Sequence, residues 1–260
     1  MRIVLTLIAG LMLAAPGGAP DAHAQELADH ITITLPSDAE TPVPAVLMFS
    51  GCGGVRQVQS DYAEAANAAG WAAVIVDSHE ARGIGRLGAR LTVCTALRLR
   101  GAERADDVFA ALEIVRADPR LDGERVVLTG WSHGGWTILD AMALSAQDRR
   151  PALTEVQAAF LLYPYCGFLT VADSASIGET IPVSMILAGR DRVVSAEACR
   201  DLARNRRADG AEITVIEEPE LTHAFDAPDQ PADPRMRYDA QGAARALNRF
   251  MTVLEAAGQG

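Results

Sequence analysis

The chain has 260 residues, of which 49% are hydrophobic and 22% charged, and its formal net charge is −11 at pH 7. This is the balance of a globular protein with ample apolar material for a core, which excludes a disordered chain. The negative charge argues against nucleic acid and anionic membrane surfaces as partners, because both select clustered lysine and arginine. Small molecules are the expected partners.

The first 24 residues have the pattern of an export signal. Met1 and Arg2 form a short basic start, residues 3–15 are apolar, and residues 22–24 (Ala-His-Ala) resemble a small-residue cleavage site. A membrane anchor is the alternative, but this apolar run is shorter than the ~20 residues that a bilayer core requires. We expect residues 1–24 to be removed and residues 25–260 to form one domain. The mature protein is then expected to be periplasmic or extracellular, with no membrane anchor.

Apolar runs and amphipathic stretches alternate along the rest of the chain. The runs are nearly continuous in apolar character, as in strands that are covered on both faces. The alternation predicts a doubly wound, mostly parallel sheet of about seven to eight strands with helices on both faces. Strands are expected at residues 31–35, 45–49, 71–77, 125–129, 156–163, 182–188 and 212–217, and helices at 58–69, 102–117, 134–146, 196–207 and 239–257.

Residues 130–134 read Gly-Trp-Ser-His-Gly and fit the G-x-S-x-G nucleophile elbow. In this motif a sharp turn from strand to helix lifts the serine hydroxyl above the edge of the sheet. The motif alone is weak, but a strand-like run precedes it and apolar residues at helical spacing follow it. A glycine-rich turn with an incidental serine is the alternative. We take Ser132 as the candidate nucleophile.

A serine nucleophile needs a histidine base and an acid that orients it, here in the chain order serine, acid, histidine. Only His133 and His223 follow Ser132 among the five histidines, and His133 lies inside the elbow. His223 is therefore the expected base. Asp191 follows an apolar run and is the expected acid, with Asp173 as the second candidate.

The loop at residues 50–54 (Ser-Gly-Cys-Gly-Gly) follows an early predicted strand. Its glycines allow a close approach of backbone to substrate. An oxyanion hole takes one backbone N–H from such a loop and one from the residue after the nucleophile. The expected donors are the N–H groups of Cys52 and His133, and a turn made only for chain reversal is the alternative.

The one long irregular segment, residues 78–100, is rich in arginine. Against the single acid Glu80 it carries five arginines: Arg82, Arg86, Arg90, Arg98 and Arg100. One hypothesis is that Arg82 and Arg86 face the mouth of the site and bind a carboxylate of the substrate by bidentate pairing. The alternative is that all are solvated loop arginines.

Four cysteines in an exported chain are expected to pair, because thiols oxidise outside the cytoplasm. Three connectivities are open, and the spacing is not that of a zinc site. We favour Cys52 with Cys94 and Cys166 with Cys199, since each pair is placed on loops at the same edge of the sheet. Four buried free thiols are the alternative. No metal or cofactor is expected.

Together these motifs resemble the dienelactone hydrolase-like branch of the α/β-hydrolases over most of the mature chain. The resemblance is carried by residues 50–54, 77–83, 130–135, 189–191 and 223–226. It implies an α/β-hydrolase fold without a large cap domain. Two departures are visible: many relatives have histidine where Ser50 stands, and dienelactone hydrolase itself has a cysteine nucleophile where this chain has Ser132.

The expected activity is hydrolysis of carboxylic esters or lactones of small, in one reading anionic, substrates through an acyl-enzyme. Two alternatives stay open. A serine peptidase of the prolyl oligopeptidase type shares the fold and the triad order, although such enzymes usually carry an added gating domain. A non-catalytic binding module on the same scaffold is the other, since a fold does not prove turnover. The sequence leaves the oligomeric state open.

Overall fold

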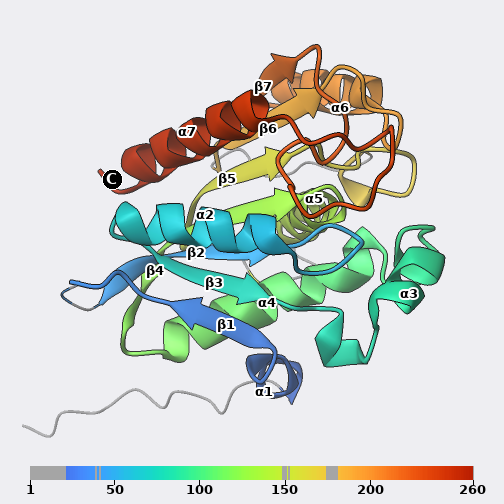
Figure 1. Cartoon of the computed structure of the whole chain (residues 1–260). Coiled ribbons are helices and arrows are strands. Elements are labelled where there is room, and N and C mark those ends of the chain that lie inside the picture. The colour runs from blue at the N-terminus through green and yellow to red at the C-terminus, as the bar shows by residue number, and fades with distance from the viewer. Residues whose placement is uncertain are drawn as a thin grey trace, which may run out of the picture.

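Seven strands form one sheet in the computed structural model, which describes residues 22–38, 40, 42–147, 151, 153–173 and 181–259. The spatial order is β1-β3-β2-β4-β5-β6-β7, and only β1 runs antiparallel to its neighbour (Figure 1). The strands are β1 (Ile31–Thr34), β2 (Val43–Phe49), β3 (Ala72–Val76), β4 (Leu121–Trp131), β5 (Val156–Leu162), β6 (Val183–Ala188) and β7 (Ile213–Glu218). The predicted fold class is confirmed.

Five longer helices cover the two faces of this sheet. They are α2 (Gln57–Ala68), α4 (Gly101–Ala117), α5 (His133–Ala146), α6 (Ala196–Ala208) and α7 (Ala240–Ala257). The helices α2 and α7 lie on one face, whereas α4 and α5 lie on the other (Figure 1). Short helical turns complete the fold: α1 (Ala22–Ala28), the 3₁₀ turns η1 (Glu80–Arg82) and η3 (Val171–Asp173), α3 (Arg86–Gly88) and the π-helical η2 (Ala89–Val93).

The core follows the two-residue period of the strands. In β2 the side chains of Leu47 and Phe49 join the cluster under α4 and α5, whereas Val46 and Met48 join the cluster under α2 and α7. All four are fully buried. Successive strand residues point to opposite faces, so a continuous apolar run serves two cores at once.

The segment 78–100, predicted to be irregular, contains the short turns η1, α3 and η2, and two further elements, β4 and α1, also differ from the prediction. The strand β4 begins four residues before the predicted start at 125, because its early residues pair with β2, Leu121 lying opposite Val43. The helix α1 was not predicted. Its Leu27 is fully buried, and His23 Nε2 lies 2.7 Å from Asp107 Oδ1 of α4.

The expected export signal, residues 1–24, lies outside the described residues except for 22–24, which begin α1. Among the described helices, none is both long enough and apolar enough to span a bilayer.

The loops after β2, β4, β6 and β7 leave the same edge of the sheet, because these strands are parallel. Crevices outside the carboxyl ends of parallel strands are where open α/β sheets bind ligands. All candidate site residues on these loops are therefore brought to one edge.

Candidate active site

Ser132 occupies a strained turn between β4 and α5. Its backbone has φ 51° and ψ −108°, and its N–H donates to the carbonyl of Leu162 at 2.8 Å. A Cβ at Gly134 would lie 1.9 Å from the carbonyl oxygen of Phe49, and one at Gly130 would lie 2.6 Å from the backbone of Gly134. Only glycine therefore fits at the two ends of the G-x-S-x-G motif, because the backbones of β4, α5 and β2 are in close contact there.

In the triad expected from the sequence, His223 lies within hydrogen-bonding distance of both Ser132 and Asp191. The Nε2 atom of His223 is 2.9 Å from Ser132 Oγ, and its Nδ1 atom is 2.6 Å from Asp191 Oδ2. The side chains of His223 and Asp191 are 5% and 1% exposed. Such a geometry allows the hydroxyl to donate to Nε2 while Nδ1–H donates to the carboxylate.

The carboxylate of Asp191 is fixed by its own loop. Its Oδ1 atom accepts backbone N–H groups from Val193 at 2.8 Å and from Val194 at 3.0 Å, which leaves Oδ2 for His223. The second acid candidate, Asp173, is the last residue of η3, and its side chain lies outside the described part of the structure. The structure thus pairs the imidazole with Asp191.

Asp226 anchors the histidine loop, a role that is not predicted from the sequence although residues 223–226 carry part of the family resemblance. The buried carboxylate accepts the indole N–H of Trp131 at 3.0 Å and the hydroxyl of Tyr163 at 2.5 Å. Burial raises the pKa of Asp226, and the two donors only partly oppose this shift. These bonds tie the His223 loop to the ends of β4 and β5.

The loop at residues 50–54 lies against the nucleophile. A Cβ at Gly51 would lie 3.7 Å from Ser132 Cβ, and the N–H of Gly54 donates to Gly51 O at 3.1 Å to close a tight turn. His133 is the first residue of α5, where backbone N–H groups have no acceptor within their own helix. Two backbone segments therefore flank the Ser132 hydroxyl.

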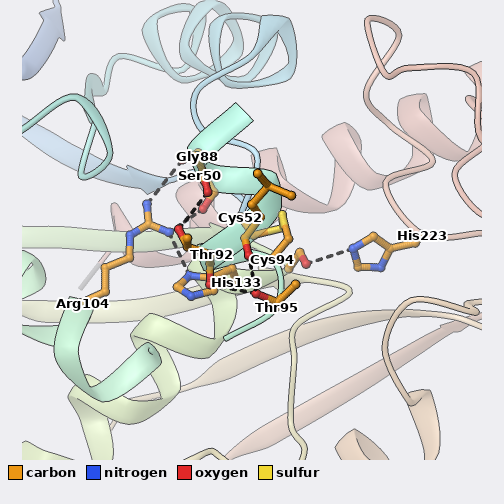
Figure 2. Close-up of a disulfide and its surroundings, with 11 residues drawn as sticks. Ser50, Cys52, Gly88, Thr92, Cys94, Thr95, Arg104, His133 and His223 are labelled. Carbon is orange, nitrogen blue, oxygen red and sulfur yellow. Dashed lines mark hydrogen bonds between the residues drawn. A yellow bond between two sulfur atoms is a disulfide. The ribbon is translucent and has the colours of Figure 1, made fainter. Parts of the chain in front are cut away.

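All four cysteines are in disulfides, in the pairing favoured from the sequence. Cys52 bonds to Cys94 across 42 residues and Cys166 to Cys199 across 33. The first bond joins the loop at residues 50–54 to the residue that ends η2, close to His223 (Figure 2). One wall of the site is thus covalently attached to the segment 78–100.

A cavity of about 360 Å³ opens beside Ser132 and His223. Apolar and aromatic side chains form much of its lining: Val58, Trp131, Tyr163, Val193 and Met236. Three arginines and one acid also line it: Arg56, Arg90, Arg235 and Asp233. Such a cavity has the size and mixed lining of a site for a small organic molecule.

Arg82 and Arg86 are placed elsewhere, which corrects the expectation that they face the mouth of the site. The guanidinium of Arg82 donates to both carboxylate oxygens of Asp107, at 2.7 and 2.9 Å. Burial raises the pKa of Asp107, but the hydrogen bonds and charge of Arg82 hold it below its usual value. Arg86 lines a separate depression with His79. Arg82 is therefore the counter-ion of the buried Asp107 carboxylate, and it does not bind the substrate as the sequence suggested.

Comparison with known proteins gives one family. A model described as the dienelactone hydrolase family matches residues 31–258. No curated protein matches the sequence.

Solved structures share the fold. A protein from Klebsiella pneumoniae subsp. pneumoniae MGH 78578, assigned as a dienelactone hydrolase, has a TM-score of 0.69 and 16% identity, over 86% of this chain and 92% of its own. Esterase 2 of Thermogutta terrifontis, phosphoramylated by tabun, has a TM-score of 0.66 and 18% identity, over 88% of this chain and 89% of its own. A dienelactone hydrolase-like promiscuous phosphotriesterase from metagenomic libraries has a TM-score of 0.65 and 19% identity, over 87% and 92%.

Proposed function

The chain belongs to the dienelactone hydrolase family, and on that premise we propose that it hydrolyses carboxylic esters or lactones with Ser132 as nucleophile, His223 as general base and Asp191 as the acid that orients the base. The observation that carries the proposal is the continuous chain of two hydrogen bonds, 2.9 Å from Ser132 Oγ to Nε2 and 2.6 Å from Nδ1 to Asp191. Serine is a weak nucleophile without such a base.

In the first half of the reaction, His223 Nε2 takes the hydroxyl proton as Ser132 Oγ forms a bond to the acyl carbon. The carbonyl electron pair moves to oxygen, where the N–H groups of Cys52 and His133 would stabilise it. When the oxyanion collapses, the bond to the alcohol oxygen breaks and His223 returns its proton to that oxygen. An acyl-enzyme remains on Ser132.

In the second half, water takes the place of the alcohol. His223 removes a proton from the water as its oxygen attacks the acyl carbon, and the same N–H groups hold the new oxyanion. Collapse then releases the carboxylic acid, and the proton on Nε2 passes back to Ser132 Oγ. For a lactone the alcohol is part of the same molecule, so the product is one hydroxy acid.

The proposal includes small substrates that carry a negative charge, and the size of the cavity and the three arginines in its lining support it. Its volume of about 360 Å³ lies near the lower end of ligand pockets, which span about 300–1,000 Å³. Arg56 lies 3.5 Å from Asp229, and Arg235 is hydrogen-bonded to Asp233. Arg90 is exposed on η2 and lines the same cavity, so it is the best-placed arginine for a substrate carboxylate.

Export to the periplasm or the cell exterior is part of the proposal. Its support is the apolar run that follows the basic first residues and the pairing of all four cysteines, since disulfides persist in oxidising compartments.

The test is covalent labelling together with turnover. We expect a fluorophosphonate probe to label the wild-type protein and the protein to hydrolyse p-nitrophenyl acetate, with both lost in Ser132→Ala. A related esterase that reacts with tabun makes an organophosphorus probe a reasonable choice. Labelling that persists in Ser132→Ala would reject Ser132 as nucleophile.

Two further outcomes separate the alternatives. Faster cleavage of a peptide anilide than of p-nitrophenyl acetate would favour a peptidase. A folded wild-type protein that neither reacts with the probe nor hydrolyses any member of an ester and lactone panel would favour a binding module.

A further inference from the structure

Arg104 is a fully buried arginine of α4 that none of the steps above uses. Its Nη1 atom donates to the carbonyl of Ser50 at 2.7 Å and lies 3.2 Å from His133 Nδ1. Its Nε atom donates to Ser78 Oγ at 2.9 Å. Figure 2 shows this guanidinium between Ser50 and His133, on the side of the oxyanion loop away from His223.

Among the described residues no carboxylate is hydrogen-bonded to Arg104, although the charges of Asp107 and Asp77 act on it from farther away. The acid of this buried cluster, Asp107, is hydrogen-bonded to Arg82 and to His23. Burial lowers the pKa of Arg104 to about 10, and the charge of Asp107 opposes the shift, so the guanidinium stays protonated at neutral pH. Burial of a cation carries a large desolvation penalty, and an apolar side chain would fill the same space at less cost.

The contacts of Arg104 go to both halves of the proposed oxyanion hole. Ser50 begins the loop that carries the Cys52 N–H, and His133 supplies the other N–H from the start of α5. Burial, followed by the charge of Arg104, lowers the pKa of the His133 side chain well below its usual range. The ring is therefore neutral, and its Nδ1 can accept a hydrogen bond from the guanidinium.

We propose that Arg104 is a positioning residue for the oxyanion hole: it ties the Ser50–Gly54 loop to His133 and places a fixed positive charge behind the site of the oxyanion. It acts through these two residues and does not touch the substrate. The proposal rests on the proposed function, because the oxyanion exists only if Ser132 attacks a carbonyl.

The negative charge on the oxyanion develops in the transition state and is absent from the bound substrate. Arg104 is proposed to act only on the stabilisation of that charge. A lost positioning residue should therefore lower kcat and leave KM nearly unchanged. Removing one oxyanion donor outright lowers kcat by about 10²–10³-fold. Displacing two donors that are still present should cost less, and we expect about a 10- to 100-fold fall in kcat.

The experiment compares Arg104→Met and Arg104→Lys with Arg82→Met in the full chain, using p-nitrophenyl acetate. Arg82 belongs to the same buried cluster but donates to Asp107 and to the carbonyl of Ser78, not to Ser50 or His133. Circular dichroism and the thermal midpoint are recorded for each variant. We expect Arg82→Met to lose stability and keep kcat, Arg104→Met to lose kcat at constant KM, and Arg104→Lys to recover part of kcat because the charge remains.

The proposal is overturned if folded Arg104→Met keeps kcat within about twofold of wild type, or if Arg82→Met loses kcat equally. Should Arg104→Met not fold, Arg104→Lys decides: reduced kcat at wild-type KM supports the role, and full kcat rejects it. The wild-type and Ser132→Ala assays are read first. An inactive wild type rejects the proposed function and this inference with it, whereas an active wild type leaves the Arg104 variants to test the inference alone.

Discussion

The backbone of Ser132 has a φ of 51°, in the left-handed region that non-glycine residues rarely adopt. Tyr163 and Ala224, which line the same cavity, have φ values of 38° and 51°. Each such residue costs on the order of 1–3 kcal/mol and persists only where its surroundings hold it. Three of them at one cavity indicate that the fold maintains strain where the nucleophile and the His223 loop are presented.

A prediction at the scale of one residue concerns Arg90. Replacing it with glutamine should raise KM about 10-fold for an ester that carries a carboxylate, because a charge-assisted hydrogen bond of about 1.5 kcal/mol is lost. KM for a neutral ester of similar size should change less than about twofold. The measurement is steady-state kinetics on p-nitrophenyl succinate and p-nitrophenyl butyrate.

Arg86→Gln is the matched control for Arg90, because Arg86 is an exposed arginine of the same segment that lines a different depression. It should leave both KM values at the wild-type level. If Arg90→Gln raised KM equally for the two esters, Arg90 would not discriminate between charged and neutral substrates.

At the scale of elements, the Cys52–Cys94 disulfide links two segments that both line the active-site cavity. The loop at residues 50–54 has only a tight turn of its own, and η2 is a single π-helical turn. Neither element is long enough to hold its position by backbone hydrogen bonds alone. The covalent bond is therefore expected to define their relative placement.

The corresponding prediction uses the two disulfides as a matched pair. Their loops of 42 and 33 residues should give similar entropic stabilisation, about 4 kcal/mol each. The double variants Cys52→Ser with Cys94→Ser, and Cys166→Ser with Cys199→Ser, should thus lose similar stability. Only the first should also lose kcat by more than about 10-fold, since it releases a proposed oxyanion donor.

Thermal midpoints and kcat of both double variants, measured under conditions where both are folded, test this prediction. If the two double variants had the same kcat, the proposal that the Cys52–Cys94 disulfide positions an oxyanion donor would be rejected.

At the scale of the whole molecule, two buried ionisable groups change the stability of the fold in opposite directions as the pH falls. Burial, followed by the charge of Arg104, lowers the pKa of His79 to about 3. The unfolded chain then binds a proton that the folded chain does not, so His79 makes the protein less stable as pH falls below about 6.5. Burial raises the pKa of Asp140 to about 6, so this group makes the protein less stable as pH rises from about 4 to 6.

Variants should separate these two contributions. His79→Phe should lose less free energy of unfolding than wild type between pH 6.5 and 4.5, by roughly 2–3 kcal/mol. Asp140→Asn should lose more than wild type over a similar range, because it cannot take up the proton that favours the folded state. Urea denaturation at four pH values from 4.5 to 7.5 gives the comparison. Curves parallel to that of wild type for both variants would contradict these assignments.

The sequence by itself determined the order of elements and the candidate triad. Each predicted strand was a local apolar run, and each predicted helix had its own period, so both could be read within one window. Ser132, Asp191 and His223 were identified by a motif, a chain order and the ends of strands, and the structure brings them together. The loop at residues 50–54 was found in the same way, because its glycines follow a strand directly.

Only the tertiary structure decided which charged residues serve the site. Arg104 reaches Ser50 across 54 residues, and Asp226 reaches Trp131 across 95. Arg82 is hydrogen-bonded to Asp107 and does not face the cavity beside Ser132. The physical reason is that a charged side chain acquires its role from what is buried beside it. Burial arises from contacts between segments far apart in the chain, which no local pattern encodes.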